Sequence, residues 1–191
     1  MGMLASAETV AAVATTLKRH VPPPIVLDPV MVATSGAQLL PDDAVTNLRE
    51  LLLPMTTILT PNVAEAKLLL RNAEINVPDI TSVDDLIDMA RSIQTLGPKC
   101  VLVKGGHLPL TKSGEISVQE ADHHTVLNVL HDGQRTTLFS ADYIASRNTH
   151  GTGCSLACRY FRPPNTLLDR SRMALVPMAF LNVLLMTLQP L

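Results

Sequence analysis

Polar residues with the chemistry to bind phosphate and a divalent cation follow three short apolar runs of this chain. Asp28 follows one run, Asn62 and Glu65 follow the second, and Lys104 with Gly105-Gly106-His107 follows the third. Carboxylate oxygens suit Mg²⁺, and a lysine ammonium suits a phosphate. The pattern therefore indicates a site for phosphoryl chemistry.

A glycine-rich segment near residue 150 could bind an anion. Gly151 and Gly153 allow a sharp turn whose N–H groups face a ligand, and a helix is expected to begin behind them. Cys154 would lie in the first turn of that helix, where the dipole favours a thiolate that accepts a proton from a substrate hydroxyl. A plain tight turn followed by a small core cysteine remains the alternative. The phosphate-binding loop ending in Gly-Lys-Ser/Thr and the dinucleotide fingerprint are both absent.

Alternating helical and apolar segments must position these residues. Helices are expected over residues 6–19, 41–52, 62–71 and 84–96, strands over 25–27, 57–60 and 100–103, and a hairpin over 125–130 and 136–139. This order predicts an α/β fold with a mostly parallel sheet, flanking helices and an antiparallel hairpin at its edge. Ligands of such sheets bind beyond the carboxyl ends of the strands, where the polar residues fall.

The composition restricts the class of protein. A length of 191 residues suits a single domain, and a net charge of −2 supplies no basic surface for nucleic acid. With 3% aromatic residues, the core must consist of Leu, Val, Ile, Ala and Met. An odd count of 3 cysteines indicates a reducing compartment and predicts a cytoplasmic location.

Five ordered motifs resemble those of hydroxymethylpyrimidine/phosphomethylpyrimidine kinases of thiamine biosynthesis, a branch of the ribokinase-like kinases. They are Met1-Gly2-Met3-Leu4, Asp28-Pro29-Val30-Met31, Thr60-Pro61-Asn62 with Glu65-Ala66, Lys104-Gly105-Gly106-His107, and Asn148-Thr149-His150-Gly151-Thr152-Gly153-Cys154. The resemblance implies phosphorylation of 4-amino-5-hydroxymethyl-2-methylpyrimidine and then of its monophosphate. It also implies ATP and Mg²⁺ as cofactors and a homodimer as the assembly to test.

The resemblance further implies a role for each matching residue. Cys154 matches the catalytic base, and Gly151, Thr152 and Gly153 match the turn that neutralises the transferring phosphoryl group. The remaining matches are Lys104, Thr60 and Asn148 for ATP and phosphate, Asn62, Glu65 and Asp28 for magnesium, and Met3 and Val30 for the pyrimidine pocket. In a simpler interpretation, Glu65 and Lys104 are solvated residues at the ends of a helix and a strand. Asp28 would then only accept hydrogen bonds within a turn. A zinc site built from His107, His150, His123 and His124 is disfavoured by their spacing.

The resemblance covers residues 1–157, which predicts a partial kinase domain there and a divergent tail over 158–191. At the N-terminal end, the strands that come earlier in the family would be missing, and the sheet would be incomplete on that side. At the back, the apolar run over 173–191 reaches the length of a membrane span, but Pro177 and Asn182 argue against one. An incomplete or mis-spliced gene product is the preferred hypothesis for both ends.

Two other functions stay open beside the pyrimidine kinase. A pyridoxal-type kinase would use a related fold on a similar ring alcohol, although the Asn148-Thr149-His150 and Gly-Thr-Gly-Cys segments favour the pyrimidine enzyme. A catalytically impaired remnant would bind nucleotide, or pair with a full-length kinase, without turnover.

Overall fold

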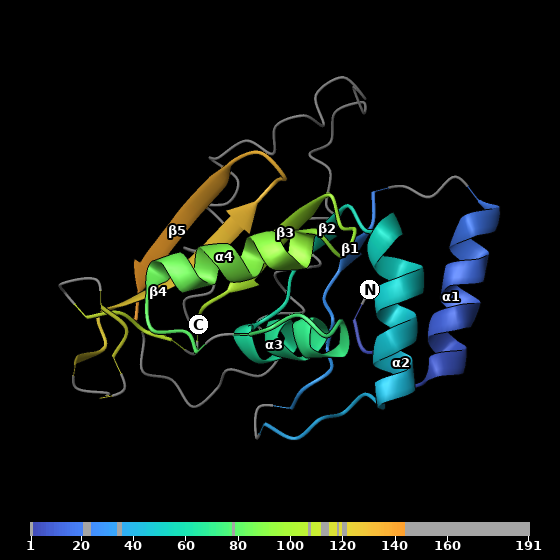
Figure 1. The fold of residues 1–191 in the computed structure, drawn as a ribbon, viewed down its shortest axis with the longest axis horizontal. Coiled ribbons are helices and arrows are strands. Elements are labelled where there is room, and N and C mark those ends of the chain that lie inside the picture. Colours follow the sequence, from blue (N-terminus) through green and yellow to red (C-terminus); the bar gives the residue numbers. More distant parts are fainter. Residues whose placement is uncertain are drawn as a thin grey trace, which may run out of the picture. The chain divides into compact units, whose positions relative to one another are not determined.

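The computed structural model describes residues 2–20, 24–33, 36–77, 79–106, 108–111, 115–117, 119 and 122–143. These residues belong to one compact unit, Met1–Tyr143. Its elements are α1 (Ala7–Arg19), β1 (Val26–Leu27), α2 (Asp42–Asn47), η1 (Leu48–Leu52), η2 (Leu53–Met55), β2 (Ile58–Leu59), α3 (Val63–Asn72), α4 (Val83–Gln94), β3 (Cys100–Lys104), β4 (Thr125–His131) and β5 (Thr136–Asp142) (Figure 1). The expected helices and strands in this part of the chain are confirmed with shifts of a few residues at their ends, apart from the helix expected over 41–52.

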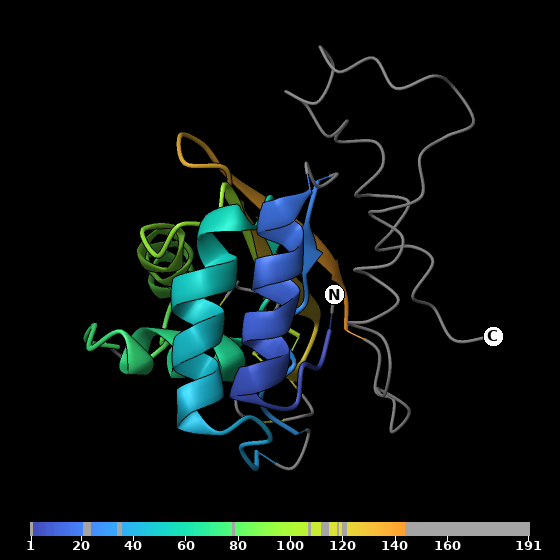
Figure 2. The same ribbon diagram turned by 90° about the vertical axis from the view of Figure 1, so that its right-hand side faces the viewer.

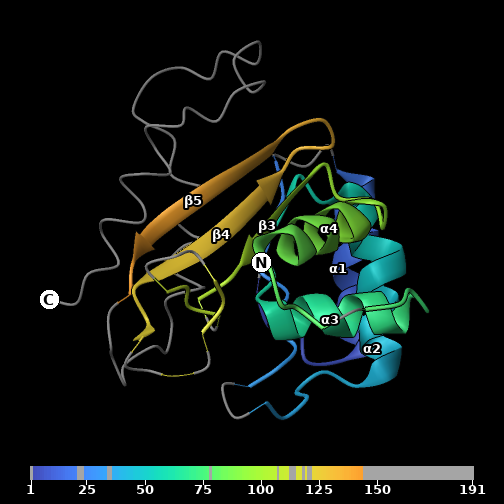
Figure 3. The same ribbon diagram turned by 60° about the vertical axis from the view of Figure 1, so that its left-hand side comes forward.

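The five strands form one sheet in the order β1-β2-β3-β4-β5. β1, β2 and β3 run parallel, whereas β4 is antiparallel to both β3 and β5. The predicted edge hairpin is therefore confirmed, and Figure 3 shows β4 and β5 as its two long arms. Its turn uses Gly133 at a φ of 89°, while the Asp132 carboxylate accepts the Gln134 and Arg135 amides at 2.9 and 2.7 Å.

The core consists of the aliphatic residues that the composition predicted. Leu27, Leu59 and Val101 lie side by side across β1, β2 and β3, and each is 0% exposed. α4 packs on β3 and β4, α3 contacts α4 and β3, and α1 packs along α2 (Figure 2). This packing holds the three parallel strands at fixed spacing, so the residues after each strand are held as well.

Local capping decides where the main helices begin. Ser6, predicted as a helix cap, accepts the Thr9 amide at 3.3 Å and starts α1. Asn62 and Ser82 start α3 and α4, each in a reciprocal capping box with the acidic residue three positions later. The helix after residue 41 differs from expectation, because it ends in the π-helical η1 and the 3₁₀ turn η2. Pro54 in η2 lacks the N–H that a continuing helix needs.

Among the described helices, none has the length and apolar character required to cross a bilayer. Residues 173–191, for which a membrane span was considered, lie outside the described part of the chain.

Candidate active site

The carboxyl ends of the three parallel strands bring Asp28, Thr60 and Lys104 together. Asp28 follows β1, Thr60 follows β2, and Lys104 ends β3. The Lys104 ammonium donates to Asp28 Oδ1 at 2.7 Å, and the Thr60 hydroxyl donates to the same oxygen at 3.1 Å. A partly buried cation, a buried carboxylate and a buried hydroxyl therefore form one connected cluster, in line with the polar residues expected after each strand.

Backbone pairing beyond the regular strands fixes this arrangement. The Thr60 amide donates to the Leu27 carbonyl at 2.9 Å, and the Lys104 amide donates to the Pro61 carbonyl at 2.8 Å. Asn62 and Lys104 also form an isolated parallel bridge. Backbone hydrogen bonds that continue beyond the strands therefore hold Asp28, Thr60 and Lys104 close together.

Solvent reaches the members of the cluster unequally. The side chains of Lys104 and Asp28 are 17% and 3% exposed, and Thr60 is 0% exposed. An ammonium has three N–H donors, of which Asp28 takes one, so Lys104 keeps hydrogen-bonding capacity for an anion. Lys104 is therefore the member of the cluster best placed to meet a ligand.

Thr60 lies behind Asp28, with its hydroxyl 3.1 Å from Asp28 Oδ1 and 3.5 Å from the Leu27 carbonyl. These contacts orient the Asp28 carboxylate toward Lys104. A direct contact between Thr60 and nucleotide, which the family resemblance implies, stays a prediction.

Asn62 and Glu65 lie beside this cluster at the N-terminus of α3. The Asn62 amide donates to Glu65 Oε2 at 2.7 Å, and the Glu65 amide donates to Asn62 Oδ1 at 2.9 Å. The family resemblance paired these residues for magnesium, and the structure shows that they also cap the helix. The Asn-x-x-Glu spacing before an apolar run is itself a sequence signal for such a cap.

Burial raises the pKa of Glu65 from 4.5 to about 7. The hydrogen bond from the Asn62 backbone, the charge of Lys104 and the Met31 backbone oppose this rise, while the charge of Asp28 adds to it. Glu65 is 3% exposed, so its ionised form lacks the hydration it would have at the surface. Burial thus brings proton exchange at Glu65 near neutral pH, in the field of the Asp28 and Lys104 charges.

Gly105 and Asn128 hold the end of β3, and of these two only Gly105 was named among the sequence motifs. The Gly105 amide donates to Asn128 Oδ1 at 3.2 Å, and Asn128 lies opposite Lys104 in the pairing of β3 with β4. A Cβ on Gly105 would collide with the Leu127 carbonyl oxygen, so only glycine fits there. No local pattern marks Asn128, because its role depends on a strand paired across the sheet.

The other predicted site residues are placed only in part. Met3 is 57% exposed and Val30 is partly exposed. Asn148, Gly151, Thr152, Gly153 and Cys154 lie outside the described residues, as do His107 and His150. In the described part of the chain, no three His, Cys, Asp or Glu side chains group as metal ligands. His123 instead packs edge-on against the Tyr143 ring, with 4.8 Å between the ring centres.

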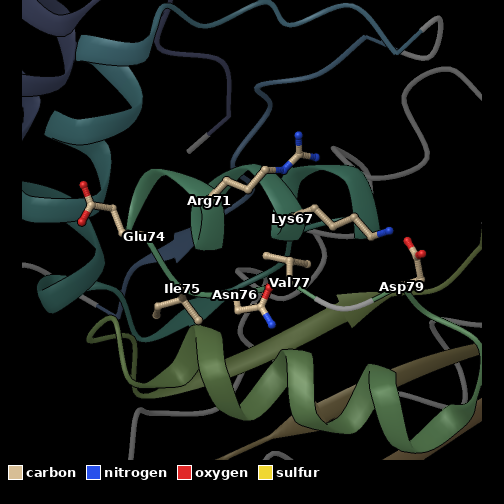
Figure 4. Close-up of a pocket in the computed structure, with 7 residues that line it drawn as sticks. All are labelled: Lys67, Arg71, Glu74, Ile75, Asn76, Val77 and Asp79. Carbon is tan, nitrogen blue, oxygen red and sulfur yellow. The ribbon is translucent and has the colours of Figure 1, made fainter.

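A surface hollow of about 520 Å³ lies at the C-terminal half of α3 (Figure 4). Its lining residues are Lys67, Arg71, Glu74, Ile75, Asn76, Val77 and Asp79. None of them belongs to the cluster at the strand ends. The hollow carries both positive and negative side chains at an exposed position, whereas the strand-end cluster is buried and connected. The cluster is therefore the stronger candidate for the active site.

A mostly parallel sheet flanked by helices, with polar residues at the carboxyl ends of its parallel strands, defines the class as α/β. Solved structures of vitamin kinases with the ribokinase-like fold are similar to this chain. A crystal structure of Bacillus subtilis pyridoxal kinase in complex with ADP matches with a TM-score of 0.66 and 30% identity, over 83% of this chain and 53% of that one. The predicted ribokinase-like fold is confirmed.

The family follows from the sequence comparisons. The family model described as "Phosphomethylpyrimidine kinase" matches residues 1–159. A Schizosaccharomyces pombe protein, named among the hydroxymethylpyrimidine/phosphomethylpyrimidine kinases, is 45% identical over 82% of this chain and 28% of its own length. The Escherichia coli hydroxymethylpyrimidine/phosphomethylpyrimidine kinase is 37% identical over 87% of this chain and 56% of its own length. The chain belongs to the phosphomethylpyrimidine kinase family, as its five motifs predicted.

The chain corresponds to only part of these relatives, since the matched regions cover 28% and 56% of the two proteins. Family membership and fold are thus established for the matched residues, whereas the activity of the chain is a separate question.

Proposed function

We propose that this chain phosphorylates 4-amino-5-hydroxymethyl-2-methylpyrimidine, and then its monophosphate, with ATP. The observation that carries this proposal is the partly buried Lys104–Asp28 pair of 2.7 Å at the carboxyl edge of three parallel strands. It provides a fixed positive charge at the position where α/β proteins bind ligands. Family membership supports the pyrimidine as substrate, and the ADP complex of the similar pyridoxal kinase supports a nucleotide as co-substrate.

Lys104 is proposed to contact the transferring phosphates, because phosphoryl transfer relies on stabilising the charge of the phosphoryl oxygens. Asp28, Asn62 and Glu65 would hold Mg²⁺. This donor set fits the ion, since Mg²⁺ in phosphoryl-transfer sites uses one or two carboxylates together with substrate phosphates. Because a carboxyl group must be ionised to bind a cation, Mg²⁺ would displace the proton that burial favours on Glu65. When bound, Mg²⁺ would neutralise charge on the phosphates.

Cys154 is proposed as the catalytic base. Its thiolate would take the proton of the hydroxymethyl group, whose oxygen then bonds to the γ-phosphorus while the bond to ADP breaks. The amides of Gly151, Thr152 and Gly153 would bind the phosphoryl oxygens. Thr60 and Asn148 would contribute to the ATP site. Met3 and Val30 would contact the pyrimidine.

Three further proposals concern the chain as a whole. Residues 1–157 form the kinase part and 158–191 a divergent tail. The protein acts in the cytoplasm, and two copies associate as a homodimer. Size-exclusion chromatography with light scattering tests the last point, and a monomer at micromolar concentration would refute it.

Pyrimidine-dependent ADP release by the purified chain tests the proposed function. Cys154→Ala should lower turnover by about 10²-fold or more, the range of general base catalysis. Cys158→Ala is the matched control and should keep turnover near the wild-type rate. Circular dichroism would show that all three proteins are folded. Absence of ADP release from folded wild-type chain would refute the kinase proposal and favour a remnant that only binds nucleotide or a full-length kinase.

A pyridoxal-type kinase is the second candidate, because the structure of Bacillus subtilis pyridoxal kinase matches with a TM-score of 0.66. The structure of Staphylococcus aureus pyridoxal kinase in complex with pyridoxal also matches, with a TM-score of 0.63 and 25% identity. Competition between pyridoxal and the hydroxymethylpyrimidine for turnover decides between the two. A higher kcat/KM for pyridoxal would replace the leading proposal.

A further inference from the structure

The backbone amide of Gly105 lies at the point where β3 ends and the Lys-Gly-Gly segment begins. Gly105 is buried, and its N–H donates to the side-chain oxygen of Asn128 at 3.2 Å. A buried amide without an acceptor is strongly unfavourable. The Asn128 side chain therefore satisfies a polar group beside the proposed phosphate-binding lysine.

Crowding explains why a side chain supplies this acceptor. A Cβ on Gly105 would collide with the Leu127 carbonyl oxygen, so β4 runs directly against the Gly105 backbone. Asn128 is the residue opposite Lys104, and the regular pairing of β3 with β4 stops at this pair. The Asn128 side chain thus adds one more hydrogen bond between β4 and the chain just after β3, at Gly105.

This attachment bears directly on Lys104. Its own amide is held by the Pro61 carbonyl at 2.8 Å on the β2 side, and the following amide is held by Asn128 on the β4 side. Between these two anchors, the Lys104 side chain reaches Asp28 at 2.7 Å. Releasing the Gly105 amide would remove one of the two anchors that fix where the ammonium lies.

We propose that Asn128 is a positioning residue that holds Lys104 on Asp28 through the Gly105 amide, and thereby sets the affinity for nucleotide phosphate. The part concerning affinity rests on the proposed function. The part concerning the position of Lys104 does not, and it can be measured without substrate.

The test compares Asn128→Leu, which keeps the size of the side chain but has no acceptor, with Asn128→Asp, which keeps an acceptor oxygen. Val126→Ala is the matched control, because Val126 lies two positions earlier on β4 and faces the same side of the sheet. Two quantities are measured on the full chain. They are the rate of Lys104 acetylation by acetic anhydride, relative to the exposed Lys99, and the dissociation constant of Mg-ATP.

Asn128→Leu is expected to raise the relative acetylation rate of Lys104 and to weaken Mg-ATP binding by about tenfold, the factor set by the loss of one hydrogen bond. Asn128→Asp should restore the acetylation rate toward the wild-type value, and Val126→Ala should leave both quantities near wild type. An unchanged Lys104 rate in folded Asn128→Leu would overturn the proposal. Equal changes in Val126→Ala would also overturn it, since general loosening of β4 would then suffice.

Wild-type chain that protects Lys104 but binds no Mg-ATP would refute the proposed function and the affinity part of this proposal. The acetylation comparison would still decide whether Asn128 positions Lys104.

Discussion

The ammonium of Lys104 and the carboxylate of Asp28 form a 2.7 Å ion pair between residues that are 76 positions apart in the chain. With side chains 17% and 3% exposed, both partners have lost most of their hydration. Removing one partner of such a pair leaves an uncompensated buried charge, whereas removing both charges does not.

Asp28→Asn is therefore expected to destabilise the fold by about 3 kcal/mol. Asp28→Asn combined with Lys104→Met should recover a large part of that loss. Urea unfolding of the wild type, both single variants and the double variant measures the coupling. Additive losses in the double variant would show that the pair contributes no interaction energy.

Glu65 should make stability fall as the pH rises. Burial raises the pKa of Glu65 to about 7, against a usual value of 4.5, so the folded state holds the proton more tightly than the unfolded state. This contribution is complete below about pH 4.5 and is lost as the pH rises to about 7, with an upper bound of about 3 kcal/mol.

Glu65→Gln is the matched variant, because glutamine keeps the capping box but carries no charge. Urea unfolding of both proteins without Mg²⁺ measures the effect. Between pH 5 and pH 8, the free energy of unfolding should fall less for Glu65→Gln than for the wild type. Parallel pH profiles for the two proteins would contradict the assignment of this titration to Glu65.

Glu74 is held in the left-handed region at a φ of 58°, just after the end of α3. The Ile75 amide donates to the Leu70 carbonyl and the Glu74 amide to the Arg71 carbonyl, each at 3.0 Å, which is the helix ending that usually contains glycine. Glu74→Gly should stabilise the fold by about 1 kcal/mol. Thermal unfolding measures this gain. Glu74→Ala is the control that removes the charge but keeps the Cβ, and an equal gain there would trace the effect to charge.

The two adjacent glycines after Lys104 should respond differently to a methyl group. The Cβ of Gly105→Ala would meet the Leu127 carbonyl oxygen, whereas no atom lies within 4 Å of a Cβ at Gly106. Gly105→Ala should cost about 2 kcal/mol or more of unfolding free energy, and Gly106→Ala less than about 0.5 kcal/mol. Chemical denaturation of both variants tests this difference, and similar losses would contradict the close approach of β4.

Local sequence patterns were sufficient for most elements of the described fold. Ser6 before an apolar helical repeat predicted the start of α1, and Asp132-Gly133 between two β-rich runs predicted the hairpin turn. Such signals act over a few residues, because caps and turns satisfy nearby backbone groups. The π-helical η1 was not predicted, since its apolar spacing resembles that of an ordinary helix.

The sequence by itself also determined the family and the polar residues at the strand ends, because these residues occur in ordered motifs. Only the tertiary structure decided that Lys104 pairs with Asp28, that burial raises the pKa of Glu65, and that Asn128 binds the Gly105 amide. These three relationships depend on strand order, register and the exclusion of water. Such properties arise when distant segments pack together, so no single stretch of the chain contains them.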